Sequence, residues 1–297
     1  MVALKGKHPK KAEPKKPKIL IFGKPGVGKT WGSLDFPGVY YIDSEGGATR
    51  DHYTDKLVAA GGAYLGPEDG ANDINVVVDQ IRALATTKHE YKTLVIDSFS
   101  KLFATRIAEK TEAMEQANYD MDKTFGREKK PAISATRQMV AWFGKLDMNV
   151  ILVCHEKDVW SDGKVVGQSF DGWEKLEYEL DLIMRIVKQG NSRKAVIGKN
   201  RLEQFKEGES IAWSYKTFAE RYGQEVIEAA TVAIEPATAE QVSAVVALSN
   251  AVKLDDETRV KWFEKAGVNN WGEMDAPTIQ KCVDYLKAQL PTAEAVA

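Results

Sequence analysis

The sequence predicts an α/β fold in which helices cover both faces of a mostly parallel central sheet, followed by a small C-terminal helical domain. Short apolar runs at residues 19–22, 39–42, 93–96 and 149–153 alternate with segments of helical periodicity, as in buried parallel sheets. A glycine-rich loop directly follows the first run. From Thr238 onward the pattern is helical only, which predicts a separate helical unit.

The composition is that of an ordinary globular protein. Hydrophobic residues make up 43% of the 297 residues and charged residues 28%, with a formal net charge of −2. The chain therefore lacks the overall positive charge that would attract nucleic acid, and any binding of nucleic acid must come from local basic patches. Cys154 and Cys282 are far apart in the chain, which argues for a reducing compartment and against a disulfide framework or zinc site. No signal peptide or membrane span is apparent, so we expect a cytoplasmic protein without a membrane partner.

The chain divides into four predicted parts. Residues 1–17 are rich in lysine and proline and predict a disordered basic arm, either a solubilising tail or a segment that touches DNA. The α/β core is expected at residues 18–223. Residues 224–236, rich in Ala, Glu and Val, predict a linker, and residues 237–297 a small helical domain.

Within the core, turn sequences and periodicity place the remaining elements. The first helix is closed by the turn Asp35-Phe36-Pro37-Gly38. Two β-rich runs, separated by Gln189-Gly190-Asn191-Ser192, predict a hairpin appended to the sheet. Helices are expected at residues 29–34, 74–85, 100–117 and 133–146, and the hairpin strands at residues 182–187 and 195–197.

Capping residues predict three helices in the C-terminal part. Thr238, with Gln241 three residues later, is typical of a capping box. The second helix is expected at residues 256–266 because Gly267 suits a helix C-terminus. The third follows Asp275 and extends to about residue 290, with its apolar residues on one face.

Residues 23–30 read GKPGVGKT and match the phosphate-binding pattern G-x-x-x-x-G-K-[ST] in its required setting between a strand and a helix. The glycines allow successive backbone N–H groups to converge on phosphate oxygens. Lys29 adds a charge for the β- and γ-phosphates, and the Thr30 hydroxyl can hold Mg²⁺. The predicted nucleotide-binding residues are Gly23, Lys24, Pro25, Gly26, Val27, Gly28, Lys29, Thr30 and Trp31.

Polar side chains follow the other predicted strands, where ligands of doubly wound sheets bind. Asp97, followed by Ser98, predicts a carboxylate that fixes Mg²⁺. Glu45 or Asp43, after the second strand, could orient the water that attacks the γ-phosphate, and their spacing leaves the choice open. His155 closes the fourth strand, where it could contact the γ-phosphate or be a structural histidine.

These motifs together resemble the RecA core over residues 18–223. The match consists of the phosphate loop, Ile42-Asp43-Ser44-Glu45, Val95-Ile96-Asp97-Ser98, Cys154-His155 and Lys199-Asn200-Arg201. The resemblance implies ATP and Mg²⁺ as ligands and Glu45 as the catalytic carboxylate. It places His155 where the family carries a polar sensor, commonly Gln.

The resemblance also implies an assembly. Lys199 and Arg201 stand where such recombinases place cations that reach the γ-phosphate of a neighbouring subunit, and the alternative is an ordinary solvated hairpin. We therefore expect a homo-oligomer, either a filament or a ring. The chain looks most like phage-encoded ATPases that consist of a bare RecA core and are grouped with single-strand-annealing recombination proteins, which would place it in the cytoplasm of a bacterial host.

Two stretches, residues 119–130 and 157–175, are candidate DNA-binding loops. Each interleaves basic and aromatic residues, which suits binding of single-stranded DNA by stacking and phosphate contacts, and each also contains acids. In the RecA resemblance they follow the third and fourth strands. The predicted DNA-binding residues are Phe125, Arg127, Lys129, Lys130, Lys157, Trp160 and Lys164.

The C-terminal helices are less suited to DNA, because acids outnumber bases from Pro236 onward. They could dock a protein partner, such as a single-strand-binding or other recombination protein, through Trp262, Phe263 or Trp271. Alternatively, these aromatic residues form the core of a three-helix unit.

The leading functional prediction is a DNA-stimulated ATPase of the RecA type that assembles on single-stranded DNA and promotes annealing or strand exchange. The alternatives are a nucleotide-switched adaptor that recruits a partner through its C-terminal helices, and a motor of the ring-helicase type.

Overall fold

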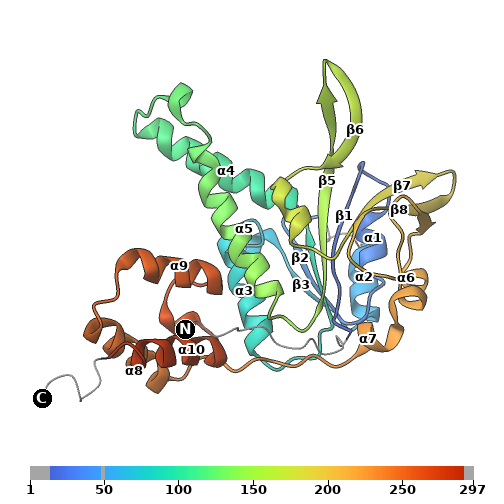
Figure 1. Ribbon diagram of the computed structural model, residues 1–297. Coiled ribbons are helices and arrows are strands. Elements are labelled where there is room, and N and C mark those ends of the chain that lie inside the picture. The colour runs from blue at the N-terminus through green and yellow to red at the C-terminus, as the bar shows by residue number, and fades with distance from the viewer. Residues whose placement is uncertain (1–13, 48–50, 291–297) are drawn as a thin grey trace, which may run out of the picture.

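The computed structural model describes residues 14–47 and 51–290. Its centre is a nine-stranded sheet in the order β3-β2-β4-β5-β1-β7-β8-β9, with β6 paired to β5 outside this path (Figure 1). The strands are β1 (Lys18–Gly23), β2 (Val39–Asp43), β3 (Ala63–Leu65), β4 (Thr93–Asp97), β5 (Asn149–Ser161), β6 (Lys164–Phe170), β7 (Leu182–Gln189), β8 (Ser192–Asn200) and β9 (Ser210–Ala212).

The sheet is parallel from β3 through β1 to β7, and antiparallel at β8 and β9. The predicted α/β fold, with a mostly parallel central sheet and C-terminal helices, is confirmed. Because β1, β2, β4 and β5 run in the same direction, their carboxyl ends lie along one edge of the sheet. The register pairs Gly23 with His155 and Asp43 with Asp97, so the strand-end residues predicted from the sequence become neighbours.

Helices cover both faces of the sheet (Figure 1). Alternate residues of each strand enter two separate apolar cores, because successive side chains of a strand point to opposite faces. One core takes in α2, α6 and α7 together with Val27 and Leu34 on either side of α1, and the other takes in α3, α4, α5 and the C-terminal helices. The helices of the core domain are α1 (Lys29–Ser33), α2 (Asp51–Ala59), α3 (Ile74–Thr86), α4 (Phe99–Gln116), α5 (Lys130–Phe143), α6 (Tyr215–Tyr222) and α7 (Gln224–Glu228).

The C-terminal helices are α8 (Ala239–Ala251), α9 (Asp256–Ala266) and α10 (Ala276–Lys287), close to the ranges predicted from their caps. Thr238 and Gln241 form the reciprocal capping box, and Gly267 ends α9 in the left-handed conformation, with φ of 72°. These helices pack on the core domain beside α3 and α5 (Figure 1).

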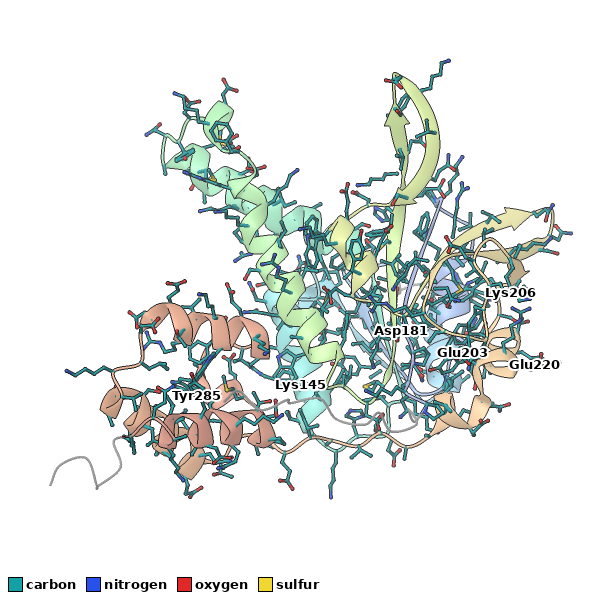
Figure 2. All side chains as sticks on the ribbon, in the orientation of Figure 1. Lys145, Asp181, Glu203, Lys206, Glu220 and Tyr285 are labelled. Carbon is teal, nitrogen blue, oxygen red and sulfur yellow. The ribbon has the colours of Figure 1, made fainter. Side chains whose placement is uncertain are left out.

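Polar contacts join the C-terminal helices to the core. Lys145, at the end of α5, faces them (Figure 2) and lies 2.6 Å from the Asp275 carboxylate. Trp142 Nε1 donates to the Gly267 carbonyl at 2.8 Å, and Trp271 is buried in the shared apolar core. Trp262 and Phe263 are partly buried and pack edge-to-face against Trp271. These aromatic residues therefore pack internally, in an apolar core that the C-terminal helices share with the core domain and not in a separate three-helix unit.

The expectation of a loop directly after the fourth strand is wrong. β5 continues to Ser161 and returns as β6, so most of residues 157–175 form an antiparallel hairpin. Asp162 and Gly163 form its two-residue turn, with φ of 50° and 72°. An Asp-Gly pair between alternating residues favours such a hairpin, and this local signal was available in the sequence.

The structure also contains elements that the sequence analysis did not predict. α2 and β3 lie between residues 50 and 66, where polar and small residues obscure the periodicity, and β3 has only three residues, all half-buried. β9 and α6 extend the core after the predicted hairpin.

The segments on either side of the core domain contact it. Most of the predicted basic arm, residues 1–13, lies outside the described residues. Lys16 is only 5% exposed, and its Nζ donates to the carbonyls of Asp147, Ala229 and Ala230. In the predicted linker, the Ile234 N–H donates to the Ala85 carbonyl at 2.8 Å. Among the described residues, no helix has the length and apolar character needed to cross a bilayer.

Candidate functional site

The phosphate loop joins β1 to α1 in the conformation that its glycines permit. Gly26 and Gly28 have φ of 76° and 87°, in the left-handed region, and Gly28 is the N-cap of α1. Lys29 Nζ donates to the Gly23 carbonyl at 2.7 Å and to the Lys24 carbonyl at 3.1 Å. Burial lowers the pKa of Lys29, against the opposing effect of Asp97 and Glu45. The lysine charge therefore lies directly beside the concave backbone that can receive phosphate.

Thr30 and Asp97 meet at the base of the loop. The Thr30 hydroxyl donates to Asp97 Oδ2, and the Tyr41 hydroxyl donates to the same oxygen at 3.4 Å. Burial raises the pKa of Asp97 to about 6, partly opposed by the hydrogen bond from Thr30. Because burial disfavours the ionised form of this carboxylate, a nearby cation would stabilise it.

This pair fits a magnesium ion that arrives with a nucleotide. Among the described residues, no group of three or more His, Cys, Asp or Glu side chains could hold a metal by itself. Mg²⁺ commonly takes only one or two protein ligands and completes its shell with phosphate oxygens and water. Thr30 and Asp97 supply oxygen ligands of that kind, next to the phosphate loop.

Asp43 and Glu45 have different surroundings. Asp43 is 1% exposed, and its Oδ1 accepts the backbone N–H groups of Glu45 and Gly46, both at 2.9 Å. The Glu45 side chain turns toward the end of β4, where Ser98 Oγ donates to Glu45 Oε1 at 2.5 Å. Asp43 therefore shapes the turn that carries Glu45, while Glu45 presents its carboxylate to the pocket.

His155 completes this group from β5. Its Nε2 lies 2.7 Å from Glu45 Oε1, and both side chains are about half exposed. The hydrogen bond from His155 lowers the pKa of Glu45 to about 2, and the same contact raises the pKa of His155. The contact therefore favours the charged form of each group, the carboxylate of Glu45 and the imidazolium of His155.

A pocket of about 640 Å³ joins the phosphate loop to these strand ends. Its volume suits a cofactor-sized ligand. The lining includes Gly23, Pro25, Gly26, Lys29, Thr30, Tyr41, Asp43, Glu45, Tyr53, Asp97, His155 and Glu156. The pocket thus brings together most of the residues that the sequence analysis assigned to nucleotide, metal and catalysis.

Three predicted nucleotide-binding residues have side chains directed elsewhere. Val27 is buried in the apolar core beneath the loop. Lys24 is exposed and contributes its carbonyl to Lys29. The Trp31 ring faces α2, with Lys56 Nζ 3.8 Å from its centroid and His52 and Tyr53 beside it.

Lys199 and Arg201 lie at the opposite edge of the sheet from the phosphate loop. Asn200 between them pairs with Leu182, which in turn pairs with Ile19 at the start of β1. Gly23 is four residues further along β1, roughly 13 Å at a rise of about 3.3 Å per residue. Lys199 Nζ donates to the Leu180 carbonyl and Arg201 to the Tyr178 carbonyl. Neither cation is part of the pocket in its own chain.

The predicted DNA-binding residues lie on two projections beyond the carboxyl edge of the sheet (Figure 1). One is the connection between α4 and α5, where Phe125 is 88% exposed. The other is the β5–β6 hairpin, where Trp160 is 64% exposed. Arg127, Lys129, Lys130 and Lys164 are exposed, whereas Lys157 is half-buried and lies 3.5 Å from Glu174.

Parts of the same stretches are structural. Phe170 is 1% exposed and packs against Phe22, and Trp173 is partly buried with Arg137 over its ring. Lys123 pairs with Asp120 at 2.7 Å. The exposed aromatic and basic residues are therefore concentrated near the tips of the projections.

Several residues of the site had no individual signal in the sequence. Tyr41 lies within β2 and donates to Asp97, and Ser98, noted in the sequence only as the residue after Asp97, donates to Glu45; both contacts depend on the register of β2 and β4. Glu156 lines the pocket and forms a bidentate pair with Arg185, at 2.8 and 3.0 Å. These partners come from different strands, adjacent for β2 and β4 and on either side of β1 for β5 and β7, so only the sheet order reveals them.

A comparison with protein-family models agrees with the phosphate-loop assignment. The sequence model of a family described as an AAA domain matches residues 15–211. Among solved structures, the chain is similar to the crystal structure of the RadB recombinase, with 18% identity and a TM-score of 0.42. That similarity covers 65% of this chain and 84% of the other. No curated protein matches the sequence.

Proposed function

This chain belongs to the AAA domain family, and from that premise we propose that it is an ATPase of the RecA type that acts on single-stranded DNA. The observation that carries the proposal is the convergence of Lys29, Thr30, Asp97 and Glu45 on one pocket at the carboxyl edge of the sheet. A phosphate loop, a metal-binding pair and a carboxylate are the parts that hydrolysis of a nucleoside triphosphate requires.

In the proposed reaction, water attacks the γ-phosphorus and the bond to the β-γ bridging oxygen breaks, giving ADP and phosphate. Lys29 neutralises the phosphate oxygens, and Glu45 orients the attacking water and accepts its proton. Bound Mg²⁺, held by Thr30 and Asp97, would offset the charge on the β- and γ-oxygens. The low pKa of Glu45 makes it a weak base, so orientation of the water is its larger contribution.

His155 links the pocket to the β5–β6 hairpin in this proposal. It lies on β5 where the strand leaves the core, and the same strand continues without interruption to Ser161. A γ-phosphate that competes for the imidazole would weaken its contact with Glu45 and bias the position of the hairpin. Nucleotide state would thereby alter the surface that carries Trp160.

Single-stranded DNA is the proposed partner because Phe125 and Trp160 are exposed beside cations. Bases can stack on such rings while the phosphates meet lysine and arginine, without sequence preference. Lys199 and Arg201 would complete the pocket of a neighbouring copy, in a filament or a ring. The proposed outcome is annealing or strand exchange, in keeping with a phage-encoded recombination protein.

A second candidate function is a nucleotide-switched adaptor with slow turnover. The contacts that favour it are those of Glu45, whose carboxylate is already occupied by Ser98 and His155. In this role the C-terminal helices would recruit a recombination protein, and hydrolysis would time its release.

The test compares the ATPase rate with and without single-stranded DNA, with electron microscopy in parallel. Stimulation by DNA, together with filaments or rings that require ATP and DNA, is expected for the first function. A monomer with DNA-indifferent hydrolysis would favour the adaptor.

Trp160→Ala provides a specific variant for this test. Loss of one stacking platform should weaken DNA binding by about 1–3 kcal/mol and reduce stimulation at limiting DNA. Val166→Ala on the same hairpin is the matched control, because Val166 is also exposed, at 62%, but offers no ring. Equal DNA affinities for the two variants would contradict a role for Trp160 in stacking.

A further inference from the structure

Arg193, the second residue of β8, lies against the phosphate loop. An ideal Cβ atom placed on Gly28 would come within 2.3 Å of Arg193 Nε and 2.5 Å of its Cδ. The arginine side chain therefore crosses the loop glycine in direct contact, at the N-terminus of α1. No sequence motif marks this position, because Arg193 is more than 160 residues from the loop.

Trp213 anchors this contact from two sides. Its Nε1 donates to the Gly28 carbonyl at 3.1 Å, and its backbone N–H donates to the Arg193 carbonyl at 2.9 Å. The ring also fills the space over Gly32, where an ideal Cβ would meet Trp213 Nε1 at 2.2 Å. Trp213 is 6% exposed, so Arg193 is tied to the loop through a buried side chain.

The strand order places Arg193 on the opposite side of β1 from Glu45, Asp97 and His155. β1 has β5 on one side and β7 on the other. Glu45, Asp97 and His155 all lie on the β5 side, which identifies that side with the γ-phosphate and the attacking water. A phosphate chain with its γ-phosphate on the β5 side can extend along the loop toward the β7–β8 side, where Arg193 lies.

The charge of Arg193 is available there. Within residues 14–47 and 51–290, its guanidinium forms no ion pair, and the side chain is exposed. Arg185 on the adjacent strand β7, by contrast, pairs with the Glu156 carboxylate. A free guanidinium next to the loop suits the geometry of a phosphate, which it can contact through two N–H groups.

We propose that the Arg193 guanidinium contacts the α-phosphate of the nucleotide bound in the same chain, which is the phosphate next to the nucleoside. This assignment rests on the proposed nucleotide site and adds a residue to it. Because ADP and ATP share the α-phosphate, Arg193 contributes to the affinity for both and little to the chemical step. It differs in this way from Lys199 and Arg201, which are proposed to act on the γ-phosphate of a neighbour.

The experiment measures binding of ADP and ATP by calorimetry, without DNA, for the wild-type chain, Arg193→Ala and Arg193→Gln. A charge-assisted hydrogen bond predicts roughly tenfold weaker binding of both nucleotides, with kcat at saturating ATP changed by less than about twofold. Lys194→Ala is the matched control. It removes the adjacent cation, whose side chain points to the other face of β8, and should leave both affinities unchanged.

The outcomes separate this assignment from the proposed function. ADP affinity of Arg193→Ala and Arg193→Gln within twofold of wild type, or a fall in kcat without a fall in affinity, would overturn the role of Arg193 alone. If wild type binds ADP without DNA-stimulated hydrolysis and Arg193→Ala binds it tenfold more weakly, the DNA-dependent function fails and the assignment of Arg193 stands.

Discussion

Both edges of the central sheet carry residues that the sequence predicts to be catalytic, but their side chains converge on a pocket at one edge only. At the carboxyl edge, Lys29, Asp97, Glu45 and His155 come from different elements and converge on a pocket of about 640 Å³. At the other edge, Lys199 and Arg201 donate to main-chain carbonyls of Leu180 and Tyr178 in their own chain.

This difference indicates which parts of the proposed site one chain can build. The carboxyl edge supplies in cis the phosphate loop, the pair proposed to bind Mg²⁺ and the carboxylate proposed to be catalytic. The cations at the other edge are at least a strand length away from the same pocket, so a role in hydrolysis requires a second copy. The predictions below test this contrast, from the largest expected effect to the smallest.

Removal of Lys29 should have the largest effect. Lys29→Ala eliminates the cation next to the loop carbonyls and should reduce ATP hydrolysis to background, since both phosphate binding and charge stabilisation are lost. Steady-state phosphate release measures it. Lys216→Ala, an exposed lysine on α6, is the control and should retain the wild-type rate.

Removal of Arg201, at the opposite edge of the sheet, should reduce ATP hydrolysis nearly as strongly if two subunits share the site. We expect Arg201→Ala to lower kcat by about 10³-fold, the lower end of the effect of an arginine supplied in trans. ATP affinity in the monomer should not change, because Arg201 is outside the pocket of its own chain.

A mixing experiment sharpens this prediction. Arg201→Ala has an intact pocket, and Lys29→Ala has an intact opposite edge, so an equimolar mixture should regain part of the activity that both lack alone. A mixture of Lys29→Ala and Glu45→Gln, both altered at the pocket, should regain none. Failure of the first mixture to recover activity would count against a shared site.

Glu45→Gln should have a smaller effect. A base with a pKa of about 2 is far from the operating pH, so the expected loss in kcat is about 10²-fold, near the lower limit for general base catalysis. Single-turnover hydrolysis separates this loss from product release. Asp43→Asn instead alters a turn, and should lower the thermal unfolding temperature more than Glu45→Gln does.

The smallest effect concerns pH. Contact with Glu45 raises the pKa of His155. Below this pKa the imidazolium is paired with the Glu45 carboxylate. As the pH rises through the pKa of His155, the imidazole loses its proton and the carboxylate is released. We expect the wild-type rate to increase by less than about tenfold across this window, on the alkaline side of about 6.5. His155→Gln cannot titrate and should give a flat profile over the same range. A rate that falls with pH in wild type would contradict the direction of this coupling.

Local patterns in the sequence were sufficient for much of the fold. The apolar strands around residues 19–22 and 93–96, the capping box at Thr238 and the stop at Gly267 depend on residues close together in the chain, and each appears as expected. Short elements such as β3, with three half-buried residues, lack a detectable period. The β5–β6 hairpin was missed although its Asp-Gly turn is local.

The sequence by itself determined the phosphate loop, because the conformations of Gly26 and Gly28 and the position of Lys29 follow from adjacent residues. It also identified the polar strand ends, since buried parallel strands end at one edge. Tertiary structure alone decided that Glu45 meets His155 and that Arg193 lies on Gly28. These two contacts join segments more than a hundred residues apart in the chain, and only the order and register of the sheet bring them together.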